Sequence, residues 1–199
     1  MAVNDYRFIL ASGSPRRKEI LDKRGFVFEI IKSDNDEITN ETEPSKVVLE
    51  LSKDKAENVY EKIKSDMSAA GDTVILAADT IVACDGKILG KPADREAAIL
   101  MIKMLEGHAH QVFTGVTIIS IKAGAVMRNS FYEKTDVFVK SMSMADIESY
   151  VETGESYDKA GGYGIQGEFG KYIDHFEGDY ENVVGLPGDR VVLELSKIY

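Results

Sequence analysis

The chain has 199 residues, enough to bury a hydrophobic core, and 44% of them are hydrophobic, as is ordinary for a globular protein. Its formal net charge of -10 argues against sequence-independent binding to nucleic acid or to an anionic membrane surface, because either would need a basic face. The single cysteine, Cys84, excludes an intrachain disulfide, and no apolar run has the length of a membrane span or the pattern of a signal peptide. We therefore expect one domain, residues 1–199, in the cytoplasm.

Apolar periodicity and turn residues predict alternating strands and helices. In chain order we expect a strand at 8–11, a helix at 15–24, a strand at 26–31, a polar acidic loop at 33–44 and a helix at 45–66 with Ser45 as its N-cap. Strands at 73–84 and 87–89 follow, then a helix capped by Asp94 and ending at 105, and strands at 111–122 and 126–140. A helix capped by Ser143 and ending at 152, a strand at 172–176, a tight turn at 182–187 and a helix toward 196 complete the chain. The hairpins predict an α/β fold with a mixed, partly antiparallel sheet flanked by helices.

The segment from Ser12 to Arg17 is the most informative part of the sequence. It places small hydroxyl residues, a glycine and two arginines between the first strand and the first helix. A guanidinium group binds phosphate through two parallel N–H···O hydrogen bonds, and a helix N-terminus adds free N–H donors. Pro15 suits the first helical position, where its missing N–H costs nothing. This turn predicts a phosphate site, and the alternative is a capped surface helix with solvated arginines.

Two other patterns suggest sites that the context does not support. Residues 162–167 match the dinucleotide fingerprint G-x-G-x-x-G, but no strand precedes them and no helix pattern follows. His108 and His110 lie near a strand start without the further ligands of a zinc site, so we expect them, like His175, to be ordinary surface or strand residues. Neither a P-loop nor the serine hydrolase motif G-x-S-x-G is present.

Asp79 interrupts the apolar strand 73–84 and is the most unusual charge in the sequence. A carboxylate in a buried strand is unfavourable unless it is paired or binds a cation, so we interpret Asp79 as a metal ligand or general base. The alternative is a strand bend at which Asp79 faces solvent. Asp36 and Glu37 supply further carboxylates from the acidic loop, and Mg²⁺ prefers such oxygen ligands.

Two lysines and a glycine-rich segment complete the candidate inventory. Lys55 lies in the long helix, where most lysines are solvated, whereas Lys91 stands between Gly90 and Pro92, which constrain its backbone. Residues 159–167 contain four glycines without hydrophobic periodicity, which allows close approach to a ligand, and Gln166 can both donate to and accept from a base edge. Together these residues suit a metal-bound nucleotide polyphosphate.

Several segments in their order along the chain resemble the Maf family of nucleoside triphosphate pyrophosphatases, formerly described as septum formation inhibitor proteins. The matching segments are Leu-Ala-Ser-Gly-Ser-Pro-Arg-Arg at 10–17, Ala-Asp-Thr at 78–80, Gly-Lys-Pro at 90–92, His-Gln-Val-Phe-Thr-Gly at 110–115, Asp-Lys-Ala-Gly-Gly-Tyr-Gly-Ile-Gln-Gly at 158–167 and Val-Gly-Leu-Pro at 184–187. The form of the 158–167 segment, together with Ala-Asp-Thr, is similar to the branch that acts on dTTP and UTP.

The resemblance implies roles for individual residues. It implies phosphate contacts at Ser12, Arg16, Arg17, Lys55 and Lys91, and catalytic roles for Asp79 and for the two lysines. It also implies metal binding at Glu37 and Asp79, recognition of the substrate base by Gln166, and substrate binding at Thr80. For the loop carboxylate it favours Glu37, with Asp36 as the alternative.

The resemblance also implies a fold and a reaction. The fold would have two lobes around a cleft, similar to inosine triphosphate pyrophosphatases. The reaction would hydrolyse a nucleoside triphosphate to the monophosphate and pyrophosphate with Mg²⁺ or Mn²⁺, by attack of water on the α-phosphorus. A homodimer is a family-level expectation. The alternative function is a non-catalytic nucleotide-binding regulator of cell division.

Overall fold

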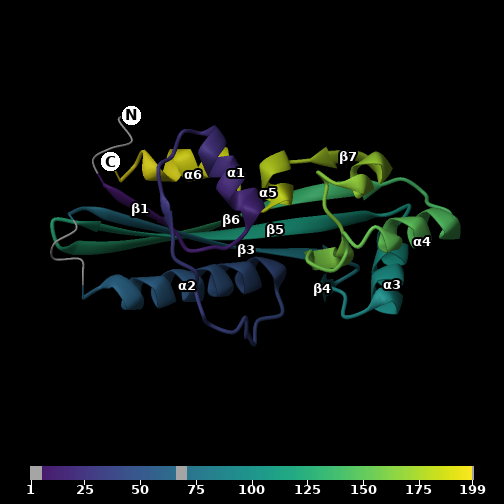
Figure 1. Cartoon of the computed structure of the whole chain (residues 1–199), viewed down its shortest axis with the longest axis horizontal. Coiled ribbons are helices and arrows are strands. Elements are labelled where there is room, and N and C mark those ends of the chain that lie inside the picture. Colours follow the sequence, from purple (N-terminus) through teal and green to yellow (C-terminus); the bar gives the residue numbers. More distant parts are fainter. Residues whose placement is uncertain (1–5, 66–70, 199) are drawn as a thin grey trace. The chain divides into compact units, whose positions relative to one another are not determined.

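The structure, a computed structural model, describes residues 6–65 and 71–198, and its strands form one mixed sheet (Figure 1). The order across the sheet is β2 (Glu29–Ile30), β1 (Arg7–Leu10), β3 (Thr73–Cys84), β5 (Ala109–Lys122), β6 (Ala125–Val139) and β7 (Ile173–Glu177), with β4 (Lys87–Leu89) on β3. Strand β1 is parallel to both β2 and β3, whereas β4 is antiparallel to β3 and β7 is antiparallel to β6. The predicted mixed α/β class is confirmed.

The helices lie close to their predicted positions. They are α1 (Pro15–Lys23), α2 (Pro44–Ile63), α3 (Arg95–Leu105), α4 (Met144–Glu152), α5 (Tyr180–Val184) and α6 (Gly188–Leu195), with short 3₁₀ helices at η2 (Ala160–Gly162) and η3 (Glu168–Tyr172). Asp94 caps α3 by accepting from the Ala97 N–H, and Ser143 caps α4, as predicted. Asp85 and Gly86 have φ of 48° and 73°, the positive values that a two-residue hairpin requires.

Three predicted elements differ from the structure. The strand expected at 26–31 is only Glu29–Ile30, and Val27 is 72% exposed, so the apolar residues there do not all face a core. Helix α2 begins at Pro44 after the N-cap Glu43 instead of Ser45, whose hydroxyl donates to Glu43 Oε1 at 2.7 Å, and the predicted end at Asp66 lies outside the described residues. Residues 182–184, expected in a turn, belong to α5.

The chain divides into two compact units. Unit 1 comprises the described residues of Met1–Asp79, Thr114–Tyr132 and Gly185–Tyr199, and unit 2 comprises Thr80–Phe113 and Glu133–Val184. Strands β3, β5 and β6 contribute residues to both units.

In unit 1, helix α2 covers one face of the sheet, and α1 and α6 lie on the other (Figure 1). Ala56, Val59 and Ile63 of α2 pack on Ile75 of β3 and Ile119 of β5, and all five side chains are at most 5% exposed. Gly115 of β5 allows this close approach, because a Cβ there would lie 2.2 Å from the Val48 carbonyl oxygen. The absence of a side chain at Gly115 therefore allows α2 to lie this close to β5.

The core of unit 2 is rich in aromatic rings. Tyr163 and Phe169 have ring centroids 4.7 Å apart, and the Tyr150 ring packs tilted against Phe169 with centroids 5.0 Å apart. His110 is fully buried, and its Nε2 lies 2.6 Å from the Tyr163 hydroxyl, so it is a core residue of a strand and not a surface residue. Cys84 is buried in the same core, and burial raises the pKa of its thiol, which agrees with an inert role.

Candidate active site

The turn between β1 and α1 is held by its own hydroxyl groups. Ser14 is the N-cap of α1, Pro15 is the first helical residue, and the Arg17 N–H donates to Ser14 Oγ at 3.5 Å. Ser12 Oγ accepts from the Ser14 N–H at 3.2 Å and from Arg17 Nη1 at 3.0 Å. The predicted phosphate turn thus exists as an ordered structure in which Ser12 and Arg17 are neighbours.

A second contact orients the Arg17 guanidinium from the far end of the sequence. Arg17 Nε donates to the Gly185 carbonyl oxygen at 2.8 Å. Gly185 has φ of 124°, a value that favours glycine, so the residue is needed for this carbonyl direction. Burial lowers the pKa of the Arg17 guanidinium, while the charges of Asp79 and Glu37 act in the opposite direction. Sequence reasoning treated the segment around Gly185 as purely structural and missed its contact with the site.

Asp79 is buried and paired. Asp79 is 5% exposed, and Lys55 Nζ of α2 donates to Asp79 Oδ1 at 2.5 Å. The same ammonium donates to Glu37 Oε1 at 2.7 Å, and the Glu37 side chain is 58% exposed. The alternative that Asp79 faces solvent is therefore wrong, and the same contacts show that Lys55 is not simply solvated.

The two carboxylates point at one cation. Oxygens of Glu37 and Asp79 both lie within 2.7 Å of the Lys55 nitrogen, so the two carboxylates can contact the same positive charge. Hard divalent ions take such oxygen donors, usually only one or two from protein carboxylates, and this pair fits that requirement. In the part of the chain that the structure describes, no group of three or more His, Cys, Asp and Glu residues could hold a metal ion.

Lys32 is a further cation at the phosphate turn that sequence reasoning missed. A Cβ on Gly13 would lie 2.6 Å from Lys32 Cε and 3.0 Å from its Nζ, so this side chain rests on the turn where Gly13 leaves space. The available signal was weak, since Lys32 follows strand β2 without any motif around it.

Unit 2 contains the other predicted residues, Thr80, Lys91 and Gln166. The Gly161 N–H donates to the Gly90 carbonyl oxygen at 2.9 Å, so the segments that carry Lys91 and Gln166 are tied together. Lys91 and Gln166 are exposed, and Thr80 is half-buried beside Asp79 in β3. The G-x-G-x-x-G segment does not join a strand to a helix, which confirms that it is not a dinucleotide fingerprint.

The structure thus gathers the predicted residues in two groups. Unit 1 brings together Ser12, Arg17, Glu37, Lys55 and Asp79, with Arg16 half-buried in the first turn of α1. Unit 2 brings together the Lys91 and Gln166 segments. None of the helices within the described residues is both long and apolar enough to cross a membrane.

Comparison with known proteins gives one consistent result. The family model described as "Maf-like protein" matches residues 7–198. A protein of Agathobacter rectalis named dTTP/UTP pyrophosphatase is 46% identical over 96% of this chain and 97% of its own length. Two further proteins with the same name are similar to this chain. The one from Caldanaerobacter subterraneus subsp. tengcongensis is 44% identical over 91% of this chain and 84% of its own length, and the one from Lachnoclostridium phytofermentans is 42% identical over 96% and 95%.

Proposed function

The chain belongs to the family of Maf-like proteins, and on this premise we propose that it hydrolyses nucleoside triphosphates to the monophosphate and pyrophosphate. The names of the three relatives above make dTTP and UTP the proposed substrates, with modified pyrimidine nucleotides as further candidates. The observation that carries the proposal is the buried Asp79, held by Lys55 in the same unit as the phosphate turn. A buried acid beside converging cations suits the activation of water next to a polyphosphate.

We propose that a divalent ion, Mg²⁺ or Mn²⁺, binds with the substrate at Glu37 and Asp79. The convergence of these carboxylates on one nitrogen supports the assignment, and Asp36 remains the alternative to Glu37. When bound, such an ion neutralises phosphate charge and acts as a Lewis acid.

The residues of unit 1 would then carry the chemistry. Asp79 orients and deprotonates the water that attacks the α-phosphorus in line with the departing pyrophosphate. Arg16 and Arg17 bind phosphate oxygens through their guanidinium forks, and Ser12 donates its hydroxyl to the same oxygens. Lys55 stabilises the charge that develops on the pyrophosphate. Because this reaction requires mainly positioning and charge stabilisation, no protein nucleophile is needed.

We assign base recognition and one further cation to unit 2. Gln166 carries an amide that can both donate and accept, and Thr80 carries a hydroxyl that can do the same, so both suit the edge of a pyrimidine. Lys91 adds a positive charge for the phosphates. The tie between Gly161 and Gly90 supports a joint role for the two segments.

We further propose that the chain acts as one Maf-like domain in the cytoplasm and forms a homodimer. The span of the family model, residues 7–198, supports the single domain. The single cysteine fits a reducing compartment.

The test is product release from a panel of triphosphates by wild type and Asp79→Asn. With Mg²⁺, wild type should release pyrophosphate from dTTP and UTP in preference to purine triphosphates. Asp79→Asn should abolish turnover while keeping the fold, because the amide preserves the shape of the side chain. Release of orthophosphate, binding without turnover, or full activity of the variant would each overturn the proposal.

A further inference from the structure

A tight turn displays Gln166 on the surface of unit 2. The Gly167 N–H donates to the Gly164 carbonyl oxygen at 3.2 Å, which closes the four residues Gly164, Ile165, Gln166 and Gly167. Gln166 itself is exposed, so no surrounding side-chain cage sets its direction. The backbone of this turn therefore sets the position from which the Gln166 side chain extends.

Glu155 holds the C-terminal side of the turn from outside. Its Oε2 accepts a hydrogen bond from the Glu168 N–H at 3.1 Å. A Cβ added to Gly167 would lie 2.0 Å from that same oxygen, so the carboxylate occupies the space that any side chain at position 167 would need. Glu155 thus contacts the turn both through a hydrogen bond and through close packing.

Lys159 packs against the N-terminal side of the turn. A Cβ on Gly164 would lie 2.9 Å from both Cδ and Cε of Lys159. The Lys159 ammonium donates to the Glu155 carbonyl oxygen at 2.7 Å and to Asp158 Oδ1 at 2.6 Å. Side chains of Glu155 and Lys159 therefore cover Gly167 and Gly164, and the Lys159 ammonium also bonds the backbone of Glu155.

We propose that Glu155 is a positioning residue for base recognition, which acts by fixing the turn that carries Gln166. The proposal rests on the proposed function, because it takes Gln166 to contact the substrate base. Without the Glu155 carboxylate the Glu168 N–H loses its partner and Gly167 loses its packing, so the turn no longer holds the Gln166 backbone in one conformation. Discrimination between bases then falls, whereas phosphate chemistry in unit 1 continues.

The first experiment measures kcat/KM for dTTP and dCTP by pyrophosphate release. Glu155→Ala should lower the dTTP to dCTP ratio about tenfold, the effect of losing one hydrogen bond to a charged group, with kcat for dTTP close to wild type. Glu155→Gln should restore the ratio, because its amide oxygen can accept the same bond. Gln166→Ala should lower the ratio as Glu155→Ala does, and the double variant should lower it no further.

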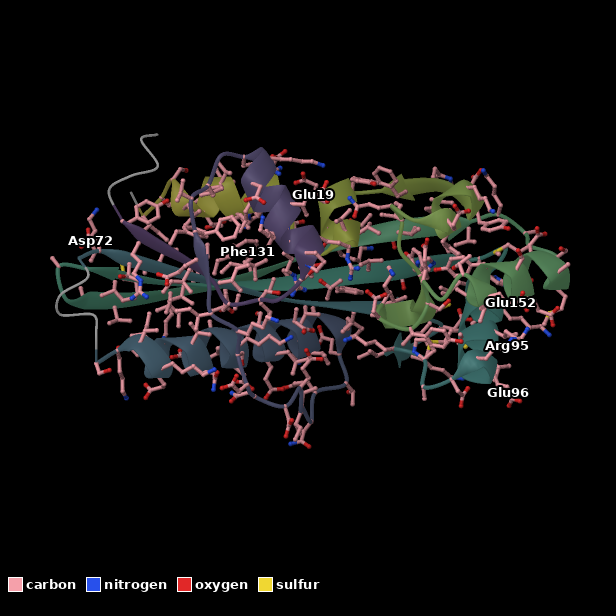
Figure 2. All side chains as sticks on the ribbon, viewed as in Figure 1. Glu19, Asp72, Arg95, Glu96, Phe131 and Glu152 are labelled. Carbon is pink, nitrogen blue, oxygen red and sulfur yellow. The ribbon has the colours of Figure 1, made fainter. Side chains whose placement is uncertain are left out.

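A second variant approaches the same contact from the glycine. Gly167 has φ of -96°, which alanine adopts without strain, so Gly167→Ala acts through its Cβ and displaces the Glu155 carboxylate. It should reproduce the loss seen in Glu155→Ala and add nothing in the Glu155→Ala background. The matched control is Glu152→Ala, which removes an equal charge from an exposed side chain paired with Arg95 at 3.3 Å (Figure 2) and should leave the ratio unchanged.

The outcomes separate this inference from the proposed function. If wild type prefers dTTP and both Glu155→Ala and Gly167→Ala keep the wild-type ratio of dTTP to dCTP, the inference is overturned and the proposed function stays intact. An equal fall for every triphosphate, or a Glu155→Gln variant as defective as Glu155→Ala, would also overturn it. Wild type that releases no pyrophosphate from any triphosphate would remove both. Should Glu155→Ala fail to fold, Glu155→Gln and Gly167→Ala decide the question by the same ratio.

Discussion

The stability of unit 2 should fall on mild acidification because of one buried histidine. His110 is fully buried against Tyr163, and its Nδ1 has no hydrogen-bond partner among the described residues. Burial lowers the pKa of His110 from 6.5 to about 4, because the imidazolium cannot be solvated there. Between these two pH values the unfolded chain binds a proton that the folded chain does not, so unfolding is favoured as the pH falls.

The size of the effect follows from the two pKa values. At neutral pH the neutral imidazole contributes its full stabilisation, and this is lost as the pH falls from about 6.5 to about 4. The loss reaches about 2 kcal/mol at pH 5 and about 3 kcal/mol in total, taking about 1.4 kcal/mol for each pKa unit. Below pH 4 both states are protonated, and this residue adds no further pH dependence.

Urea unfolding at about pH 7.5 and about pH 5 measures this difference directly. His110→Phe fills the same space without a titrating group, so its free energy of unfolding should fall about 2 kcal/mol less than that of wild type over this range. The variant starts from a lower stability because the Tyr163 hydroxyl loses its partner, but only the difference between the two pH values is tested. His175→Gln, at an exposed strand position, should behave as wild type. Equal pH dependence of wild type and His110→Phe would refute the reasoning.

Two further predictions concern unit 1. Gly115→Ala should lower the free energy of unfolding by about 3 kcal/mol and reduce kcat/KM, because its Cβ would displace helix α2 and with it Lys55. Urea unfolding measures the first effect and pyrophosphate release the second. Unchanged values would contradict the close packing of Gly115 against α2. Lys55→Met should cost about 3 kcal/mol because it leaves the Asp79 carboxylate buried without its partner. The double variant with Asp79→Asn should recover part of that loss, and a double variant less stable than Lys55→Met would contradict the pairing.

Much of the fold could be predicted because local signals and tertiary packing agree. Strand β3, helix α4 and the hairpin at Asp85–Gly86 combine clear periodicity, caps and turn residues, and the structure confirms their bounds. Strand β2 is only two residues long although its surroundings are apolar, because pattern alone cannot show which apolar side chains find a partner.

The sequence singled out several residues of the candidate site but not the contacts between them. A lone carboxylate in an apolar strand singled out Asp79, and the structure supplies the partner that burial demands in Lys55. No local pattern joins Lys32 to Gly13 or Gly185 to Arg17, since each of these contacts depends on the tertiary fold. His110 lies in a strand, one of the two expected settings, but a histidine at a strand start gives no local sign of the buried tyrosine that it meets.

The hydrogen bond from Arg17 to Gly185 joins positions 168 residues apart, and the ion pair between Arg24 and Asp189 ties the same helix to the same late segment. During synthesis the N-terminal part of a chain leaves the ribosome first, and contacts of high sequence separation form late. A nascent chain therefore carries the arginine long before it carries the carbonyl that aims it. The contact that orients the guanidinium can form only after translation has passed Gly185, so this part of the phosphate turn is completed late in synthesis.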